Sequence, residues 1–294
     1  MKLSVMKKKF LVCSLFALHC LAMPVWADDE PSQSTAETPS ITSNAPRLSG
    51  VTRTIWASGL QAPHGLVLDG DGSVWATEYK SGQVAQISAD GKTVRRYGQG
   101  LQGPAWIARV GKTVYVSERK ANRVLKLQKN GTFAPFGPAV DEPIGLAGDA
   151  RGNLLVVSHG NSQVVSLDAK GRATPVYAPQ GGKHYGYRCI VIDRDGSLLM
   201  TDETDNAVVM ATRGGRVSKW ITNLNDPTGI ALSPRGEVFV LEEGAGRVAR
   251  LDAYGAPTVV AEGLGKPRGL AFLNDKTLLI SDQQDGVIWR IALP

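Results

Sequence analysis

The chain has few cysteines and few aromatic residues, and it lacks the common catalytic signatures. Cysteine occurs only at positions 13, 20 and 189, and Phe, Trp and Tyr together make up 6% of the 294 residues. Two of the cysteines lie within the first 27 residues, so the rest of the chain has one thiol and no internal disulfide. No G-x-S-x-G elbow, H-E-x-x-H zinc motif, C-x-x-C-H haem site or P-loop occurs. Chemistry must therefore be sought at individual positions.

Helical periodicity is also absent, which argues against a helical fold. Short apolar runs between glycine turns predict β-strands instead. Cys189 lies inside one such run, so we expect a buried small hydrophobe and not a nucleophile. The Gly244-Ala245-Gly246 segment has no helix after it and is therefore no dinucleotide fingerprint.

The N-terminus has the pattern of a secretory signal peptide. Lys7, Lys8 and Lys9 form a basic start, an apolar run covers 10–22, and Ala27 ends a small-residue cleavage site. The apolar run is too short for a stable membrane anchor. We expect cleavage after Ala27, a periplasmic or secreted protein, and no membrane span in the mature chain.

Removal of this segment changes the charge of the protein. The formal net charge falls from +6 to +2, because four lysines leave and no acid does. Such a weak charge over a large domain argues against a nucleic-acid partner. Residues 28–50 are rich in Ser, Thr, Pro, Ala and acids and predict a disordered linker, so the fold is expected to cover residues 51–294.

A repeat of close to 40 residues organises that fold. Six units open on a P-x-G-like loop, at Pro63, Pro104, Pro143, Tyr187, Pro227 and Pro267, with steps of 41, 39, 44, 40 and 40 residues. The first five units each carry two glycine turns, one from the set Gly72, Gly111, Gly152, Gly196, Gly236 and one from the set Gly91, Gly131, Gly171, Gly215, Gly255. Between them lie runs such as 73–77 and 153–157, apolar on both faces. Sheets of this kind must stack on copies of themselves, which predicts an all-β propeller.

The two ends of the chain predict how many blades there are. The sixth unit stops at Pro294 after the strand 287–291 and lacks an outermost strand. The segment from Trp56 to Pro63 matches the segment from Trp220 to Pro227, which is an outer strand followed by the next blade. We therefore expect residues 51–58 to pair onto the last blade and close a six-bladed ring of four-stranded blades.

These motifs resemble known families. Asn122-Arg123-Val124, Gly246-Arg247-Val248, the P-x-G openings and the Ser/Thr-Asp/Glu strand ends are similar to NHL repeats and to the SMP-30/gluconolactonase group of six-bladed propellers. The first unit, with Asp71-Gly72-Ser73-Val74-Trp75-Ala76-Thr77-Glu78, also resembles the streptogramin (virginiamycin B) lyases, which have seven blades. The first resemblance covers 51–294, the second the first unit alone.

Acidic residues recur where the second strand of each unit ends. We place these ends at Glu78, Glu118, His159, Asp202, Glu242 and Asp282. The five acids are candidate ligands for Ca²⁺ or Mg²⁺, or general bases. The alternative, favoured for most of them, is that each carboxylate ties down the backbone of a neighbouring loop. His159 breaks the pattern and is the better functional candidate, although a buried structural imidazole is an equal alternative.

The middle positions of the P-x-G loops should reach one rim of the central channel. They are His64, Ala105, Ile144, Arg188, Thr228 and Arg268. Resemblance to gluconolactonases implies metal-binding Asn, Asp or Glu at such positions, and none is present. Instead His64, Arg188 and Arg268 make a cationic rim suited to an anionic ligand. The alternative is that these side chains pair with the acids beneath them.

Two further features point to the same rim. The 44-residue step places an insertion at 180–188, which contains His184, Tyr185, Tyr187 and Arg188 and suits either a binding mouth or a plain surface loop. Trp106 could stack on a ligand or plug the channel. His64, Trp106, His159, His184, Tyr185, Tyr187, Arg188 and Arg268 are thus the candidate ligand-binding residues.

Three functions remain open from the sequence. The preferred one is a monomeric periplasmic propeller that binds a small, anionic molecule or a protein at the rim without catalysis of its own. The second is a metal-assisted hydrolase or lyase in which Glu78, Glu118 or Asp282 holds Ca²⁺ or Mg²⁺ and His64, His159 or His184 accepts a proton. The third is a platform for interaction with other periplasmic proteins. No cofactor is required by the first or the third.

Overall fold

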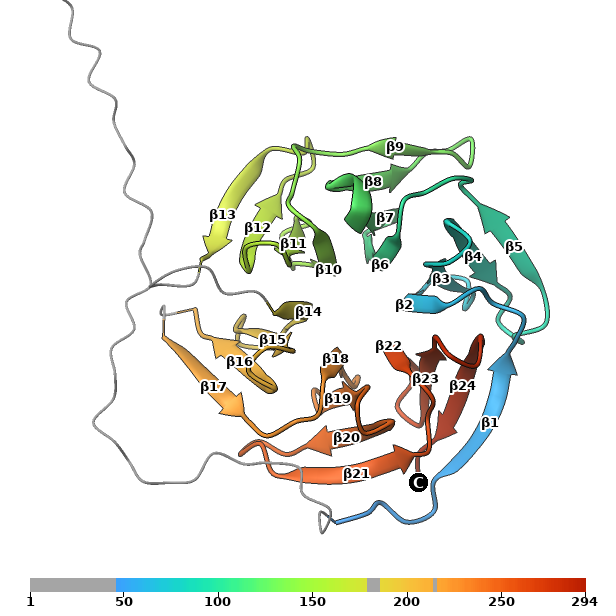
Figure 1. Cartoon of the computed structure of the whole chain (residues 1–294), viewed down its shortest axis with the longest axis vertical. Helices are drawn as coiled ribbons and strands as arrows, with labels where there is room; N and C mark the ends of the chain where they lie inside the picture. Colours follow the sequence, from blue (N-terminus) through green and yellow to red (C-terminus); the bar gives the residue numbers. More distant parts are fainter. Residues whose placement is uncertain (1–45, 179–185, 214–215) are drawn as a thin grey trace, which may run out of the picture.

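The protein is a ring of six four-stranded antiparallel sheets around a central axis (Figure 1). The computed structural model describes residues 46–178, 186–213 and 216–294. Within these ranges helical structure is limited to one 3₁₀ turn, η1 (Arg119–Ala121). The predicted all-β, six-bladed propeller is confirmed.

Each blade runs outward from the axis, with its first strand innermost. Blade 1 has β2 (Pro63–Leu68), β3 (Val74–Glu78), β4 (Gln83–Ile87) and β5 (Val94–Tyr97); blade 2 has β6 (Pro104–Val110), β7 (Thr113–Glu118), β8 (Arg123–Leu127) and β9 (Phe133–Pro135); blade 3 has β10 (Pro143–Gly148), β11 (Leu154–Ser158), β12 (Gln163–Leu167) and β13 (Ala173–Tyr177). Blade 4 has β14 (Tyr187–Ile192), β15 (Leu198–Asp202), β16 (Ala207–Ala211) and β17 (Val217–Ile221); blade 5 has β18 (Pro227–Leu232), β19 (Val238–Glu242), β20 (Arg247–Leu251) and β21 (Pro257–Glu262); blade 6 has β22 (Pro267–Asn274), β23 (Thr277–Asp282), β24 (Val287–Ala292) and β1 (Thr52–Ala57).

The core lies between neighbouring blades. Every residue of β3, β11, β15, β19 and β23 is buried, because both faces of these second strands pack against another sheet. This explains why the strands are apolar on both faces and show no alternation. The described ranges contain no helix that is long and apolar enough to cross a membrane.

The N-terminal strand completes the last blade, as predicted. β1 pairs antiparallel with β24, from Thr52 opposite Ala292 to Ala57 opposite Ile288. The chain just before β1 also adds to blade 5, because Arg47 pairs in parallel with Val259 and Leu48 donates a backbone hydrogen bond of 2.8 Å to the same residue. Residues 46–50, which the sequence analysis assigns to the linker, therefore lie on the propeller.

Glycine is required at the hairpins because of their backbone geometry. Gly72 has φ +83° and Gly91 has φ +77°, and the other described members of the two predicted sets are also positive. At Gly91 a Cβ atom would lie 2.1 Å from the Trp56 carbonyl oxygen, so any side chain would collide with β1, the strand that closes the ring. Gly215 lies outside the described residues.

Candidate ligand site at the channel mouth

The middle residue of each P-x-G loop faces the channel because of a local change in strand register. In blade 1, Pro63 pairs with Glu78 but Leu66 pairs with Ala76, so the first strand contains one extra residue directly after the proline. The first strands of the other five blades shift register at the equivalent position. Such an irregularity re-aims a side chain. All six predicted positions line one cavity of about 160 Å³: His64, Ala105, Ile144, Arg188, Thr228 and Arg268.

Close backbone contacts hold these six positions in a ring. A Cβ atom on Gly65 would lie 2.8 Å from Trp106 Cα, and one on Gly269 would lie 2.4 Å from the His64 carbonyl oxygen. The third position of the motif is therefore glycine where adjacent first strands approach this closely. Hydroxyl groups add cross-blade hydrogen bonds, for example from Thr77 Oγ1 to the Ala105 carbonyl (3.0 Å). Each rim residue is thus fixed from the preceding blade.

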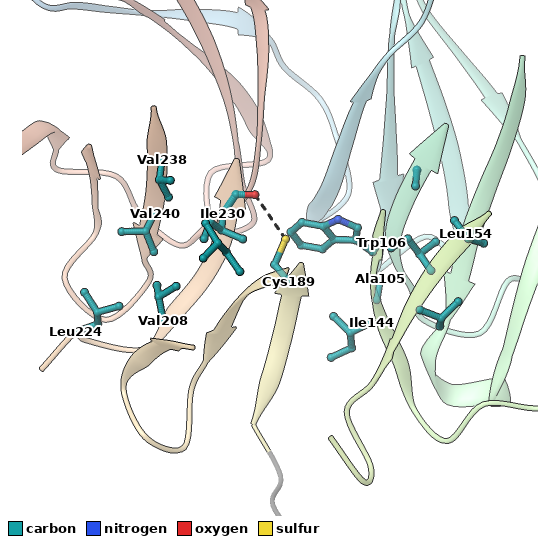
Figure 2. Close-up of a cluster of buried hydrophobic side chains, with 14 of the residues drawn as sticks. Ala105, Trp106, Ile144, Leu154, Cys189, Val208, Leu224, Ile230, Val238 and Val240 are labelled. Atoms are coloured by element: carbon teal, nitrogen blue, oxygen red, sulfur yellow. Dashed lines mark hydrogen bonds between the residues drawn. The ribbon is translucent and has the colours of Figure 1, made fainter. Parts of the chain in front are cut away.

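Trp106 and Cys189 replace the glycine of the motif in blades 2 and 4. Figure 2 shows the indole of Trp106 extending toward Cys189 of β14, whose Sγ donates to the Ile230 carbonyl at 3.7 Å. Both residues belong to one apolar cluster that draws on blades 2 to 5, with Trp106 8% exposed and Cys189 1% exposed. Burial raises the pKa of Cys189 to about 12, as expected of an inert buried thiol. Trp106 therefore lines the cavity and at the same time packs into the apolar core.

His159 does not take the place of an acid, which corrects the sequence assignment. Pro143 pairs with Ser158, as Pro63 pairs with Glu78, so the end of the second strand in blade 3 is Ser158. His159 belongs to the next position along the chain. This position forms a separate ring on the rim: Tyr79, Arg119, His159, Glu203, Glu243 and Gln283. This ring is not among the predicted site positions, although its members follow each strand end at a constant spacing.

The five acids at the strand ends are fully buried and anchor loops. Glu78 accepts a backbone hydrogen bond from Gln61 (2.8 Å) and pairs with Arg96 (2.7 Å). Glu118 and Glu242 make the same kind of contacts, Asp282 binds backbone N–H groups and the Trp289 indole, and Asp202 binds the backbone N–H groups that follow it. Among the described residues, no three His, Cys, Asp or Glu side chains gather as a metal site. The acids therefore do not fit the metal-binding interpretation, and the loop-tying alternative describes their contacts.

An ion-pair chain runs along the rim of blades 2 to 4. Arg119 donates from Nε (3.1 Å) and Nη2 (2.7 Å) to Glu142 Oε2. His159 lies between two carboxylates, with Nδ1 3.3 Å from Glu142 Oε2 and Nε2 2.8 Å from Glu203 Oε1. Arg188 Nε donates to Glu203 Oε2. His159 is thus part of the frame behind the cavity, and it is not among the residues that line the cavity.

A second chain of contacts joins blades 5, 6 and 1. Arg268 Nη1 lies 2.6 Å from Glu243 Oε2, and its Nε donates to Gln283 Oε1 (2.6 Å). The same oxygen is 3.1 Å from His64 Nε2. Because an amide oxygen only accepts hydrogen bonds, Nε2 of His64 carries a proton and Nδ1 keeps its lone pair. The imidazole stacks on the Tyr79 ring with centroids 4.6 Å apart.

The electrostatics of the cavity favour a neutral His64. Burial, followed by repulsion from Arg268, lowers the pKa of His64 from 6.5 to about 3. Burial also lowers the pKa of Arg268, and Arg188 is among the charges that add to this effect. Two guanidinium groups therefore face the same small space and repel each other.

The three arginines at the cavity differ in what they have left to donate. Arg119 donates hydrogen bonds from Nε and Nη2 to Glu142. Arg188 hydrogen-bonds through Nε to Glu203, and in the described part of the chain its two terminal nitrogens have no acceptor. Arg268 hydrogen-bonds through Nε to Gln283, while the contact of Nη1 with Glu243 Oε2 lacks hydrogen-bond geometry. Arg188 and Arg268 are thus the available donors, and their carboxylate partners are not the acids at the strand ends.

One of the three remaining site candidates can be placed. Tyr187 is 4% exposed, and its hydroxyl lies 3.0 Å from the Tyr177 hydroxyl in the core between blades 3 and 4, which corrects its expected place at the mouth. His184 and Tyr185 of the insertion lie outside the described residues. A larger hollow of about 880 Å³ between blades 4 and 5, bordered by Trp220 and Arg250, contains none of the candidate site residues.

Comparison with known proteins places the chain among lyase relatives. The model of the virginiamycin B lyase family matches residues 51–261, far beyond the first repeat to which the sequence resemblance was confined. A virginiamycin B lyase from Nocardia farcinica is 35% identical over 101 residues, which are 33% of this chain and 35% of that protein. The match thus spans about a third of the length of this curated relative.

Solved structures share the fold at low sequence identity. A catalytically inactive histidine-to-alanine variant of virginiamycin B lyase from Staphylococcus aureus, solved with quinupristin, superimposes with a TM-score of 0.65 and 16% identity over 83% of this chain and 100% of that chain. The PQQ-bound aldose sugar dehydrogenase from Streptomyces coelicolor gives a TM-score of 0.63 and 17% identity over 84% of this chain and 99% of that one.

Proposed function

Because the chain belongs to the virginiamycin B lyase family, we propose that the mouth of its channel binds a small molecule through an acidic group. The observation that carries this proposal is the pair of cavity-lining guanidinium groups, Arg188 and Arg268. Apart from the ion pair of Arg268 Nη1 with Glu243, their terminal nitrogens have no partner in the described chain. Paired guanidinium groups are well suited to a carboxylate or another oxyanion. The signal peptide expected at residues 1–27 would place this function in the periplasm or outside the cell.

The size of the cavity limits what enters it. Pockets that enclose a drug-sized ligand measure roughly 300–1,000 Å³. The mouth, with Trp106 among its lining residues, offers about 160 Å³. We therefore expect the acidic end of the ligand to enter and the remainder to stay on the rim.

The test is anion-dependent thermal stabilisation of the purified protein. With acetate, benzoate and sulfate as probes, a probe at one hundred times its Kd adds about 2.7 kcal/mol to the stability, which raises the Tm by roughly 5–10 °C. The double variant Arg188→Ala/Arg268→Ala is expected to lose this response. A control variant, Arg151→Ala/Arg216→Ala, removes the same charge from exposed positions and should keep it. A full response in the first variant would refute the proposed binding site.

A second function, elimination catalysis, is favoured by the state of His64. The Nδ1 lone pair would take a proton from a carbon next to a carbonyl group, the carbon–oxygen bond on the adjacent carbon would break, and the electron pair would leave on a carboxylate. Arg188 and Arg268 would receive that carboxylate. The low pKa of His64 makes it a weak base in the free protein. Because repulsion from the arginines is part of the reason for this low value, an anion bound between Arg188 and Arg268 would raise the pKa of His64.

Elimination and hydrolysis differ in mass balance. Quinupristin, present in the solved Staphylococcus aureus structure, is the first probe. Elimination leaves the summed mass of the products equal to that of the substrate, whereas hydrolysis adds one water. His64→Gln should lower the rate by a factor on the order of 10²–10⁴, and His159→Gln, outside the cavity, should retain most of it. No turnover of quinupristin or of related esters would leave binding as the function.

A further inference from the structure

We propose that the acidic group recognised at the mouth is a single carboxylate, and that Glu203 and Glu243 are specificity-determining residues that exclude doubly charged anions. This inference rests on the proposed binding function, because it assigns the chemical class of the group that Arg188 and Arg268 hold. Neither glutamate lines the cavity itself; each stands directly behind one of the two arginines.

Glu203 is fixed in place and charged. One of its oxygens accepts from His159 Nε2 at 2.8 Å and the other accepts from Arg188 Nε. Burial alone would raise its pKa, but the contacts with His159 and Arg188 outweigh burial and hold the pKa below its usual value. Its negative charge therefore stays close behind the Arg188 guanidinium.

Glu243 is the more deeply buried of the two glutamates. Its side chain is 9% exposed, and Oε2 lies 2.6 Å from Arg268 Nη1. Burial raises its pKa, and the neighbouring Asp226 raises it further while Arg268 and Arg188 oppose the rise. Glu243 thus places either a full negative charge or a neutral carboxyl group behind Arg268.

The charges of the four ionisable groups at the pocket nearly cancel. Arg188 and Arg268 supply two positive charges, and His64 is neutral. Glu203 and Glu243 remove one or two of these charges, so the four groups carry a net charge of +1 or 0. One carboxylate can be held between the guanidinium groups with little excess charge. A dianion leaves at least one uncompensated negative charge beside the buried carboxylates, where the low dielectric makes repulsion strong.

The third arginine does not alter this balance. Arg119 also lines the cavity, but its guanidinium is engaged by Glu142 through Nε and Nη2, and that contact holds the pKa of Glu142 below its usual value. The pair is neutral as a unit. Arg188 and Arg268 are thus the arginines left for the ligand. Two parallel N–H groups of a guanidinium match the two oxygens of one carboxylate.

The experiment compares acetate and benzoate with sulfate, which is doubly charged throughout the neutral range. Dissociation constants come from the shifts of the His64 imidazole signals in NMR titrations at constant ionic strength. The wild-type protein is expected to bind both monocarboxylates at least about tenfold more tightly than sulfate. In Glu203→Gln, sulfate should gain about tenfold relative to acetate, since the negative charge behind Arg188 is removed, and Glu243→Gln should act in the same direction by removing the charged form of Glu243.

The control is Glu237→Gln, which removes a carboxylate that pairs with Arg250 away from the channel. Its selectivity should equal that of the wild type. Tighter binding of sulfate than of acetate, still dependent on Arg188 and Arg268, would overturn this inference and leave the proposed function standing. An unchanged ratio in Glu203→Gln would overturn the role of Glu203, and one in Glu243→Gln that of Glu243. No shift of His64 with any probe would refute the proposed function as well.

Discussion

Trp106→Ala is expected to lower the free energy of unfolding by about 3–5 kcal/mol, the usual cost of truncating a buried tryptophan. The indole is 8% exposed and belongs to an apolar cluster that draws on four of the six blades (Figure 2). Its removal leaves a void in this cluster, which the rigid ring of first strands cannot close. Equilibrium unfolding in urea, followed by tryptophan fluorescence and circular dichroism, measures the change.

A matched control separates this effect from any loss of apolar surface. Ile55 on β1 is 57% exposed, so Ile55→Ala should change the stability by no more than about 0.5 kcal/mol. A loss of less than about 1 kcal/mol in Trp106→Ala would contradict the role of the indole in the apolar core.

The second large effect is expected at a buried carboxylate. Glu242→Ala should cost about 3–5 kcal/mol, because it breaks a buried ion pair and leaves a loop backbone N–H without its acceptor. Glu242 is fully buried, pairs with Arg247 at 2.6 Å and accepts the Asn225 backbone N–H at 2.9 Å. The same unfolding measurement tests this prediction.

The control here is a solvent-exposed ion pair on the same blade. Glu237 pairs with Arg250 at 3.1 Å, but both side chains are more than a third exposed, so Glu237→Ala should cost at most about 1 kcal/mol. If Glu242→Ala proved as mild as Glu237→Ala, the acids at the strand ends would not be loop anchors.

Nearly all of the fold is predictable from the sequence because the same pattern of strands and turns occurs in six repeat units. The turns need positive φ, so glycine marks them, and the second strands are buried on both faces, so their apolar runs are unbroken. Even the composite last blade follows from the match of Trp56 with Trp220. The predicted start of the propeller, residue 51, is too late, because three residues such as Pro46–Leu48 pairing with β21 leave no recognisable pattern.

The site is predictable in its position but not in its pairings. Six side chains at one point of the repeat necessarily meet around the axis, so the rim could be located in advance. The spacing of the repeat assigns His159 to the acid ring, because spacing alone carries no strand register, and the error is one residue. The division between engaged Arg119 and available Arg188 and Arg268 depends on contacts that cross between blades. No local pattern encodes such contacts.

The pairing of β1 with β24 has a consequence for the order in which the protein can fold during synthesis. β1 is synthesised before the five blades made of consecutive strands, and its partner β24 is synthesised after them. Those five blades can form as their strands leave the ribosome, but the sixth must wait for β24, and until then blade 1 lacks its neighbour on that side. A cell that makes this protein therefore handles an open ring with exposed strand edges until β24 has been made.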